Sequence, residues 1–196
     1  MSLAHYFTFL RIFISPAFPI LYIQYEWFGI PFRALPYVLL VLLCICECSD
    51  LVDGMIARRR NQVTDLGKVL DPMADSVTRI SLFLTFTQGP VALPLIVVLV
   101  FFYRDFFIST LRTLCALRGL ALAARFSGKM KAVIQACVLF LILILMIPYS
   151  MGILPLALLQ QISLIAVSIA AFYTVISMGD YLWANRIYLK KAFEGI

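Results

Sequence analysis

Apolar runs of about 20 residues follow one another along this chain, and they constrain its fold more than any other feature. Of the 196 residues, 63% are hydrophobic and only 13% are charged. A soluble domain of this size has too much surface for its volume to bury so many apolar side chains. The bilayer must therefore solvate most of the chain. We expect an all-α integral membrane protein.

Turn signals divide the apolar runs into six predicted spans. Glycine and proline interrupt the runs at residues 29–31, 88–90 and 150–152, and both residues commonly mark turns. The six expected transmembrane helices cover approximately residues 7–25, 35–57, 69–87, 91–111, 132–149 and 153–182. We expect one transmembrane domain over residues 1–196.

The lysines and arginines lie on one side of this predicted topology. They occupy the connections after the second and fourth spans and the C-terminal tail, whereas the opposite connections hold only Arg33. By the positive-inside rule, both termini and the basic connections face the cytoplasm, in the inner (cytoplasmic) membrane. The net charge of +6 then faces lipid head groups and anionic soluble substrates. We expect the lipid bilayer, and no nucleic acid, as its partner.

Two pairs of aspartates end one apolar run and begin the next. Asp50 and Asp53 are three residues apart, and Asp71 and Asp75 are four apart, so each pair shares a helical face. A short connection makes the two helices antiparallel, which brings all four carboxylates to one depth near the cytoplasmic surface. An ionised carboxylate costs about 3 kcal/mol near the bilayer centre, and neighbouring carboxylates repel each other. The set therefore calls for a counter-charge.

Two divalent cations would balance four carboxylates. Oxygen ligands with no histidine or thiolate at matching spacing favour Mg²⁺ or Mn²⁺ over Zn²⁺. Two such ions in each site would stabilise both the attacking and the leaving oxygen in a displacement reaction at phosphorus.

Two alternative readings of the acids remain open at this point. Asp71 followed by Pro72 resembles a helix N-cap with proline at the first helical position, and acids within a membrane also mark the ion paths of transporters. Capping does not require two paired carboxylate turns that face each other. A transporter path would step across the bilayer and often shows inverted repeats, whereas these acids cluster at one face.

The spacing of the acids resembles the signature of the CDP-alcohol phosphatidyltransferase family. The match covers all eight signature positions without a gap: Asp50-x-x-Asp53-Gly54-x-x-Ala57-Arg58, eight residues, then Gly67-x-x-x-Asp71-x-x-x-Asp75. The resemblance implies six transmembrane helices, a homodimer, and a cytidine diphosphate lipid as the donor of the phosphatidyl group.

The same resemblance implies roles for individual residues. Asp50, Asp53, Asp71 and Asp75 would hold the metal ions beside the diphosphate, and Asp75, last in the series, would be the catalytic general base. The resemblance also implies a set of residues that line the nucleotide site. These are Asp50, Gly54, Ala57, Arg58, Gly67 and Thr8. Glycine and alanine permit close approach of the nucleotide, and arginine binds phosphate oxygens with two donors.

A second basic stretch, residues 103–135, indicates the acceptor alcohol. So many cations beside a cationic site favour an acceptor that carries its own phosphate over a neutral or zwitterionic one. The residues predicted to bind the acceptor phosphate are Arg104, Arg112, Arg118, Lys129 and Lys131, with Asp105 organising them. The positive-inside rule accounts for part of this charge, including that of Arg125.

The basic stretch also resembles the phosphatidylglycerophosphate synthase branch of the family. The resemblance rests on Arg104-Asp105-x-x-Ile108-Ser109-x-Leu111-Arg112, on Gly128-Lys129-x-Lys131 with Gln135, on Asp180-Tyr181-Leu182 and on Thr8-x-x-Arg11. It implies transfer of the phosphatidyl group from CDP-diacylglycerol to glycerol 3-phosphate, with inositol phosphate as the alternative acceptor.

The sequence departs from this branch at a few positions. Ser76 replaces a common lysine, Thr113 replaces an acid, and Ala4-His5-Tyr6 replaces the usual opening. These departures affect the expected details of acceptor binding and leave the expected reaction intact. Glu47, one turn before Asp50, has no role that the sequence indicates.

Overall fold

The computed structural model describes residues 15–59, 65–117 and 125–194, together with their side chains apart from residues 50–74, 116 and 190–194. Residues 15–23 are helical. The elements that follow are the 3₁₀ helix η1 (Tyr25–Phe28) and the α-helices α2 (Leu35–Arg59), α3 (Asp65–Thr85), α4 (Leu95–Leu117), α5 (Phe126–Ser150) and α6 (Leu156–Glu194). Within the described ranges there is no strand, so the predicted all-α class is confirmed.

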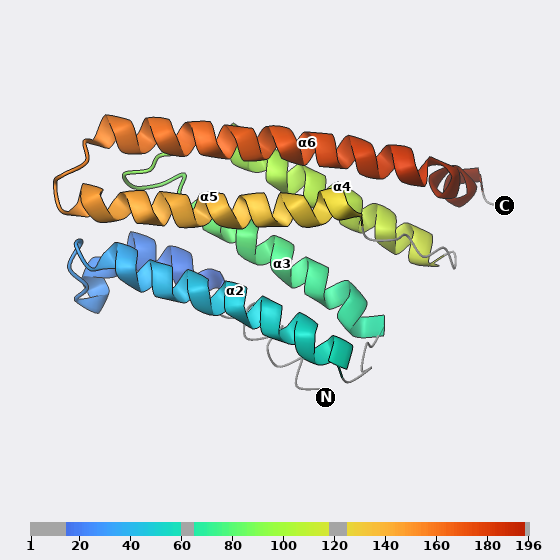
Figure 1. Cartoon of the computed structure of the whole chain (residues 1–196), viewed down its shortest axis with the longest axis horizontal. Coiled ribbons are helices and arrows are strands. Elements are labelled where there is room, and N and C mark those ends of the chain that lie inside the picture. The colour runs from blue at the N-terminus through green and yellow to red at the C-terminus, as the bar shows by residue number, and fades with distance from the viewer. Residues whose placement is uncertain (1–14, 60–64, 118–124, 195–196) are drawn as a thin grey trace.

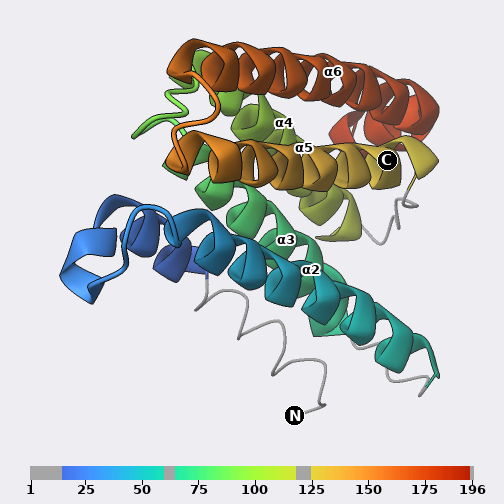
Figure 2. The same cartoon turned by 60° about the vertical axis from the view of Figure 1, so that its left-hand side comes forward.

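The helices form a bundle in which α5 packs against both α6 and α2, while α4 packs against α6 and α3. Figure 1 shows the C-terminal ends of α2, α4 and α6 and the N-terminal ends of α3 and α5 at one end of the bundle. Figure 2 shows the same order of layers after rotation, with α6 and α2 on opposite sides of α5. The elements adjoining the three basic segments therefore gather at one end.

Four helices begin or end at residues that differ clearly from the predicted spans. Helix α3 begins at Asp65 rather than near 69, and α6 ends at Glu194 rather than near 182. Helix α4 begins at Leu95 rather than near 91, because residues 86–94 form a turn closed by the Leu93 N–H, which donates to the Phe86 carbonyl at 2.9 Å. Helix α5 begins at Phe126 rather than near 132, because polar residues continue the helix beyond the apolar run. Hydropathy indicates which residues lipid can solvate, and a helix does not have to end there.

The capping interpretation of Asp71 and Pro72 is wrong. Helix α3 begins at Asp65, six residues before Asp71, so the Asp71-Pro72 pair lies inside the helix rather than at its first turn. Capping therefore does not explain the second pair of aspartates.

The core lies largely toward the end of the bundle opposite the basic segments. Phe86 is fully buried and makes edge-to-face ring contacts with Phe18 at 5.9 Å and Tyr22 at 5.6 Å between ring centroids. Phe83 of α3 packs against Phe101 of α4, with centroids 4.7 Å apart. Such aromatic pairs add about 0.5–1.5 kcal/mol beyond the area that they bury.

The outer surface of the bundle is also apolar. Large apolar side chains that are 51–72% exposed follow one another along α6, namely Ile165, Ile169, Phe172, Ile176 and Trp183. Among the described residues, Phe126–Ser150 and Leu156–Leu189 are long and apolar enough to cross a membrane. Apolar faces of this extent suit lipid rather than water.

Gly89 should be the glycine least tolerant of a side chain in the turns. Its φ is +67°, and a Cβ there would lie 2.8 Å from the buried Tyr22 hydroxyl oxygen. Gly152 has a similar φ of +76° with nothing within 4 Å. We expect Gly152→Ala to lose about 1–2 kcal/mol from backbone strain alone. Gly89→Ala should lose about 1–3 kcal/mol more from overpacking.

Thermal unfolding of the purified variants in one detergent would measure this difference. At about 2–4 °C per kcal/mol for a chain of this size, Gly89→Ala should melt visibly below Gly152→Ala. Equal melting temperatures would contradict the contact with Tyr22.

Candidate active site

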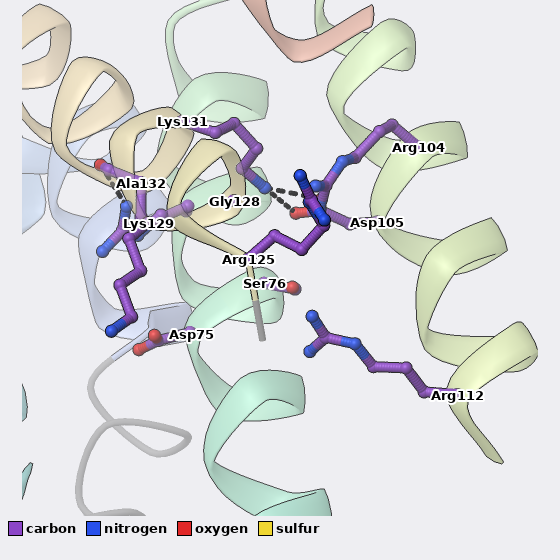
Figure 3. A pocket seen from close by; sticks show the side chains of 11 residues that line it. Asp75, Ser76, Arg104, Asp105, Arg112, Arg125, Gly128, Lys129, Lys131 and Ala132 are labelled. Atoms are coloured by element: carbon purple, nitrogen blue, oxygen red, sulfur yellow. Dashed lines mark hydrogen bonds and ion pairs between the residues drawn. The ribbon is translucent and has the colours of Figure 1, made fainter. Parts of the chain in front are cut away.

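A pocket of about 230 Å³ lies between α3, α4 and the beginning of α5 (Figure 3). Its lining contains six cationic side chains and two carboxylates. The lining residues are Asp75, Ser76, Arg79, Arg104, Asp105, Arg112, Arg125, Gly128, Lys129, Lys131 and Ala132. The pocket is smaller than the roughly 300–1,000 Å³ typical of sites for drug-sized ligands. It suits a small anion.

A buried carboxylate organises the inner wall of the pocket. Asp105 of α4 accepts hydrogen bonds from Lys131 Nζ at 2.5 and 2.7 Å and from Arg104 Nη1 at 3.0 Å. All three residues are less than 10% exposed. Arg104 Nη2 also donates to the Ser177 hydroxyl of α6 at 3.0 Å. Buried charges need such partners, so this network joins three helices and leaves one positive charge in excess.

Two further arginines of the pocket are held by α6. Arg112 Nε donates to the Tyr181 hydroxyl at 3.2 Å, and its guanidinium carbon lies 5.2 Å from the centre of the Tyr181 ring. Arg125 forms a two-pronged pair with Asp180, at 2.9 and 3.1 Å. Helix α6 thus orients cations that α4 and the start of α5 supply.

Arg79 of α3 connects the pocket to α2. Its Nη1 donates to the Ala132 carbonyl of α5, and its Nη2 lies 3.6 Å from Glu47 Oε2. Glu47, for which the sequence indicates no role, therefore pairs with a cation that lines the pocket. Arg79 is not among the site residues that the sequence predicts.

Asp75 and Lys129 lie at one side of the pocket, and Arg112 reaches in from α4 at the other (Figure 3). The pocket therefore brings together Asp75, the predicted general base, and four of the five residues predicted to bind phosphate. Those four are Arg104, Arg112, Lys129 and Lys131. The fifth, Arg118, and the nucleotide residue Thr8 lie outside the described residues.

The other signature residues lie in α2 and α3, and their side chains are outside the described part of the structure. Asp50, Asp53, Gly54, Ala57 and Arg58 are in α2, and Gly67 and Asp71 are in α3. Asp53 is six residues before the end of α2 at Arg59, and Asp71 is six after the start of α3 at Asp65. At 1.5 Å per residue, Asp53 and Asp71 are therefore equally far from the connection between the two helices. This spacing is compatible with both acidic turns lying at the same depth in the membrane.

Metal binding at this place is compatible with the donor chemistry. Among the residues whose side chains are described, no group of three or more His, Cys, Asp or Glu could hold a metal ion. Three of the four predicted ligands, Asp50, Asp53 and Asp71, are not in that set. Carboxylate oxygens on two antiparallel helices fit the preference of Mg²⁺ or Mn²⁺ for hard ligands.

Comparison with known proteins decides the family. The family model of CDP-alcohol phosphatidyltransferases matches residues 1–178. The chain belongs to the CDP-alcohol phosphatidyltransferase family. It is therefore an integral membrane phosphatidyltransferase.

Relatives within this phosphatidyltransferase family match between three quarters and nearly the whole of the chain. A protein of Bacillus subtilis (strain 168), named CDP-diacylglycerol–glycerol-3-phosphate 3-phosphatidyltransferase, is 31% identical over 195 residues, which are 96% of this chain and 97% of that protein. A protein of the same name from Rickettsia typhi (strain ATCC VR-144 / Wilmington) is 30% identical over 95% of this chain and 98% of its own length. One from Treponema pallidum (strain Nichols) is 29% identical over 74% of this chain and 69% of its own.

Several pocket residues of this phosphatidyltransferase were absent from the predicted site. In the sequence, Ser76 is only a departure from the branch pattern, the positive-inside rule accounts for Arg125, and no signal predicts a site role for Ala132. A signal existed for Arg79, because it is four residues after Asp75 in an apolar run and so shares the face of the last aspartate. No comparable signal distinguishes Arg125 from other loop cations.

The buried Asp105 network should stabilise the fold more than the outer Asp180 pair does. The side chain of Asp105 is 4% exposed, whereas those of Arg125 and Asp180 are 42% and 35% exposed. We expect Asp105→Asn to cost about 3–5 kcal/mol, because two buried cations lose their counter-charge. Asp180→Asn should change stability much less, since exposed pairs contribute little.

Thermal unfolding of the two variants in the same detergent would test this order. Asp180→Asn is the matched control, because it makes the same chemical change at an outer position. A larger fall in melting temperature for Asp180→Asn than for Asp105→Asn would contradict the assignment.

Proposed function

We propose that this enzyme transfers the phosphatidyl group of CDP-diacylglycerol to glycerol 3-phosphate, giving phosphatidylglycerol phosphate and CMP. The observation that carries the proposal is the pocket that Asp75 lines together with six cationic side chains. An acceptor that carries its own phosphate would form charge-assisted hydrogen bonds with these cations. A neutral alcohol would not require so many positive charges. The names of nearly full-length relatives support the same reaction.

The donor would bind where α2 and α3 meet. In this proposal Asp50, Asp53, Asp71 and Asp75 hold two Mg²⁺ or Mn²⁺ ions, as the family signature implies and the helix register supports. The ions would supply charge neutralisation of the diphosphate and of the departing CMP. The nucleotide would contact the residues implied by the signature, Gly54, Ala57, Arg58 and Gly67, with Thr8.

The residues of the pocket would orient the acceptor and receive its proton. Arg112 and Lys129 reach the pocket from α4 and α5 and would hold the acceptor phosphate, with Arg104 and Lys131 behind them. The acceptor hydroxyl would then face Asp75, whose carboxylate takes the proton as the oxygen attacks the β-phosphorus. The bond between that phosphorus and the CMP oxygen breaks, so the negative charge leaves with CMP.

The remaining features of the proposal concern the membrane. We infer one domain over residues 1–196, with six spans, in the inner (cytoplasmic) membrane and with the pocket facing the cytoplasm. The gathering of the elements that adjoin the basic segments at one end of the bundle supports this orientation, since basic segments stay on the cytoplasmic side. A homodimer is the assembly that the family resemblance favours.

An acceptor panel tests the reaction. Purified enzyme with CDP-diacylglycerol and Mg²⁺ or Mn²⁺ should release CMP with glycerol 3-phosphate and only at background rates with serine or glycerol. Removing the divalent ions with a chelator should stop the release. Asp75→Asn should lower kcat by about 100-fold or more, because general bases typically contribute that much. Turnover with inositol phosphate but not with glycerol 3-phosphate would refute the proposed acceptor.

A second test concerns the orientation of Arg112. Tyr181→Phe removes the hydroxyl that accepts from Arg112 Nε and keeps the ring beside the guanidinium. We expect the KM for glycerol 3-phosphate to rise about fivefold, as loss of one hydrogen bond predicts, with the KM for CDP-diacylglycerol unchanged. Tyr188→Phe is the control, because Tyr188 lies exposed on the same helix. Equal kinetics for both variants would argue against the role of Tyr181.

A further inference from the structure

We propose that Arg79 is an additional binding residue for the acceptor phosphate and that Glu47 is its positioning residue. This inference rests on the proposed function, because it deepens the description of the same pocket. Neither residue belongs to the eight-residue signature or to the predicted phosphate-binding set.

The position of Arg79 on α3 suits an acceptor whose hydroxyl faces Asp75. Arg79 follows Asp75 by four residues, so the two share a helical face about 6 Å apart along the axis. A three-carbon alcohol phosphate separates its terminal hydroxyl oxygen from its phosphorus by about the same length, five bonds of roughly 1.5 Å in an extended zigzag. Both residues line the pocket.

Among the side chains that the structure describes, Arg79 is the cation that α3 contributes to the pocket wall. The other five cations of the lining belong to α4 and to the start of α5. Three of those five share their charge with described carboxylates: Arg104 and Lys131 with Asp105, and Arg125 with Asp180. A phosphate monoester carries nearly two negative charges at pH 7. Arg79, on α3, would bind the acceptor phosphate from the same helix that carries the proposed base, Asp75.

The guanidinium of Arg79 is held on two sides before any ligand arrives. Arg79 is 8% exposed, its Nη1 donates to the Ala132 carbonyl, and its Nη2 lies 3.6 Å from Glu47. A guanidinium has five N–H donors in a rigid fork, so these two contacts do not exhaust it. Fixing the side chain in advance lowers the entropy cost of binding phosphate.

Glu47 has a position that fits this supporting role. It precedes Asp50 by three residues on α2, and so lies one turn deeper than the acidic signature on the same face. A carboxylate at that depth is costly unless it is paired. The pair with Arg79 therefore links the helix that carries the first two aspartates to the wall of the acceptor pocket.

Steady-state kinetics of the full-length enzyme in detergent micelles would test the proposal. We expect Arg79→Gln to raise the KM for glycerol 3-phosphate about tenfold or more, since hydrogen bonds between charged groups are the strong ones. The KM for CDP-diacylglycerol should stay within about twofold. Glu47→Gln should raise the acceptor KM by about threefold, and the double variant should be no worse than Arg79→Gln, because Glu47 acts through Arg79.

Two further variants separate binding from a merely structural tie between helices. Arg79→Lys keeps the charge and can reach Glu47, but it lacks the fork, so we expect an intermediate acceptor KM with little change in melting temperature. Arg33→Gln, at an exposed arginine on the opposite side of the predicted topology, is the control and should match the wild type. A lower kcat with an unchanged acceptor KM in Arg79→Gln and Arg79→Lys would overturn the proposal.

A binding measurement keeps this inference distinct from the proposed reaction. Inorganic phosphate and glycerol 3-phosphate should each raise the melting temperature of the wild type, and should do so less for Arg79→Lys and Glu47→Gln. If the wild type transfers nothing to glycerol 3-phosphate, the proposed function fails, but this comparison still tests Arg79. Equal stabilisation of the wild type and both variants would overturn the role of Arg79 whatever the reaction is.

Discussion

The buried carboxylate of Asp105 is the interaction on which the pocket depends. It pairs with Lys131 of α5 and with its own neighbour Arg104, which in turn donates to Ser177 of α6. Removing either charge from such a buried network leaves the other without compensation, at a cost of several kcal/mol. The relative positions of α4, α5 and α6 at this level are therefore set by charge as well as by apolar packing. A cationic pocket can then persist inside an apolar bundle.

Helix α6 supplies a supporting layer behind that pocket. Ser177, Asp180 and Tyr181 are three and four residues apart, and so share one face of the helix. They contact Arg104, Arg125 and Arg112 respectively. None of the three is part of the pocket lining in the structure. A single helical face thus orients three arginines that two other segments provide, which explains why a motif late in the sequence matters to a site formed by earlier helices.

The sequence predicts most of the helices because their signals are local. Apolar runs and turn residues indicate the helices, and the spacing of Asp50 to Asp75 indicates which faces carry acid. The pair of Glu47 and Arg79 could not be predicted in this way. Its partners are 32 residues apart along the chain, and only the arrangement of the helices in the bundle brings them together. The early start of α5 was not predicted for a related reason. Hydropathy indicates whether lipid or water surrounds a residue, and it does not indicate the backbone conformation of that residue.

Charge at the basic end of the bundle serves two physical purposes that composition alone cannot separate. Lysine and arginine in connecting segments orient a membrane protein, and the same residues attract anions. Geometry separates them: Arg125 precedes α5 in a connection, yet it lines the pocket and is fixed by Asp180. Arg33 is exposed on the other side of the predicted topology. A cation held by a specific acceptor at a pocket wall has lost side-chain freedom, and orientation of the protein in the membrane does not require that loss. The ligand binding proposed above would therefore account for the fixed arginines better than membrane topology does.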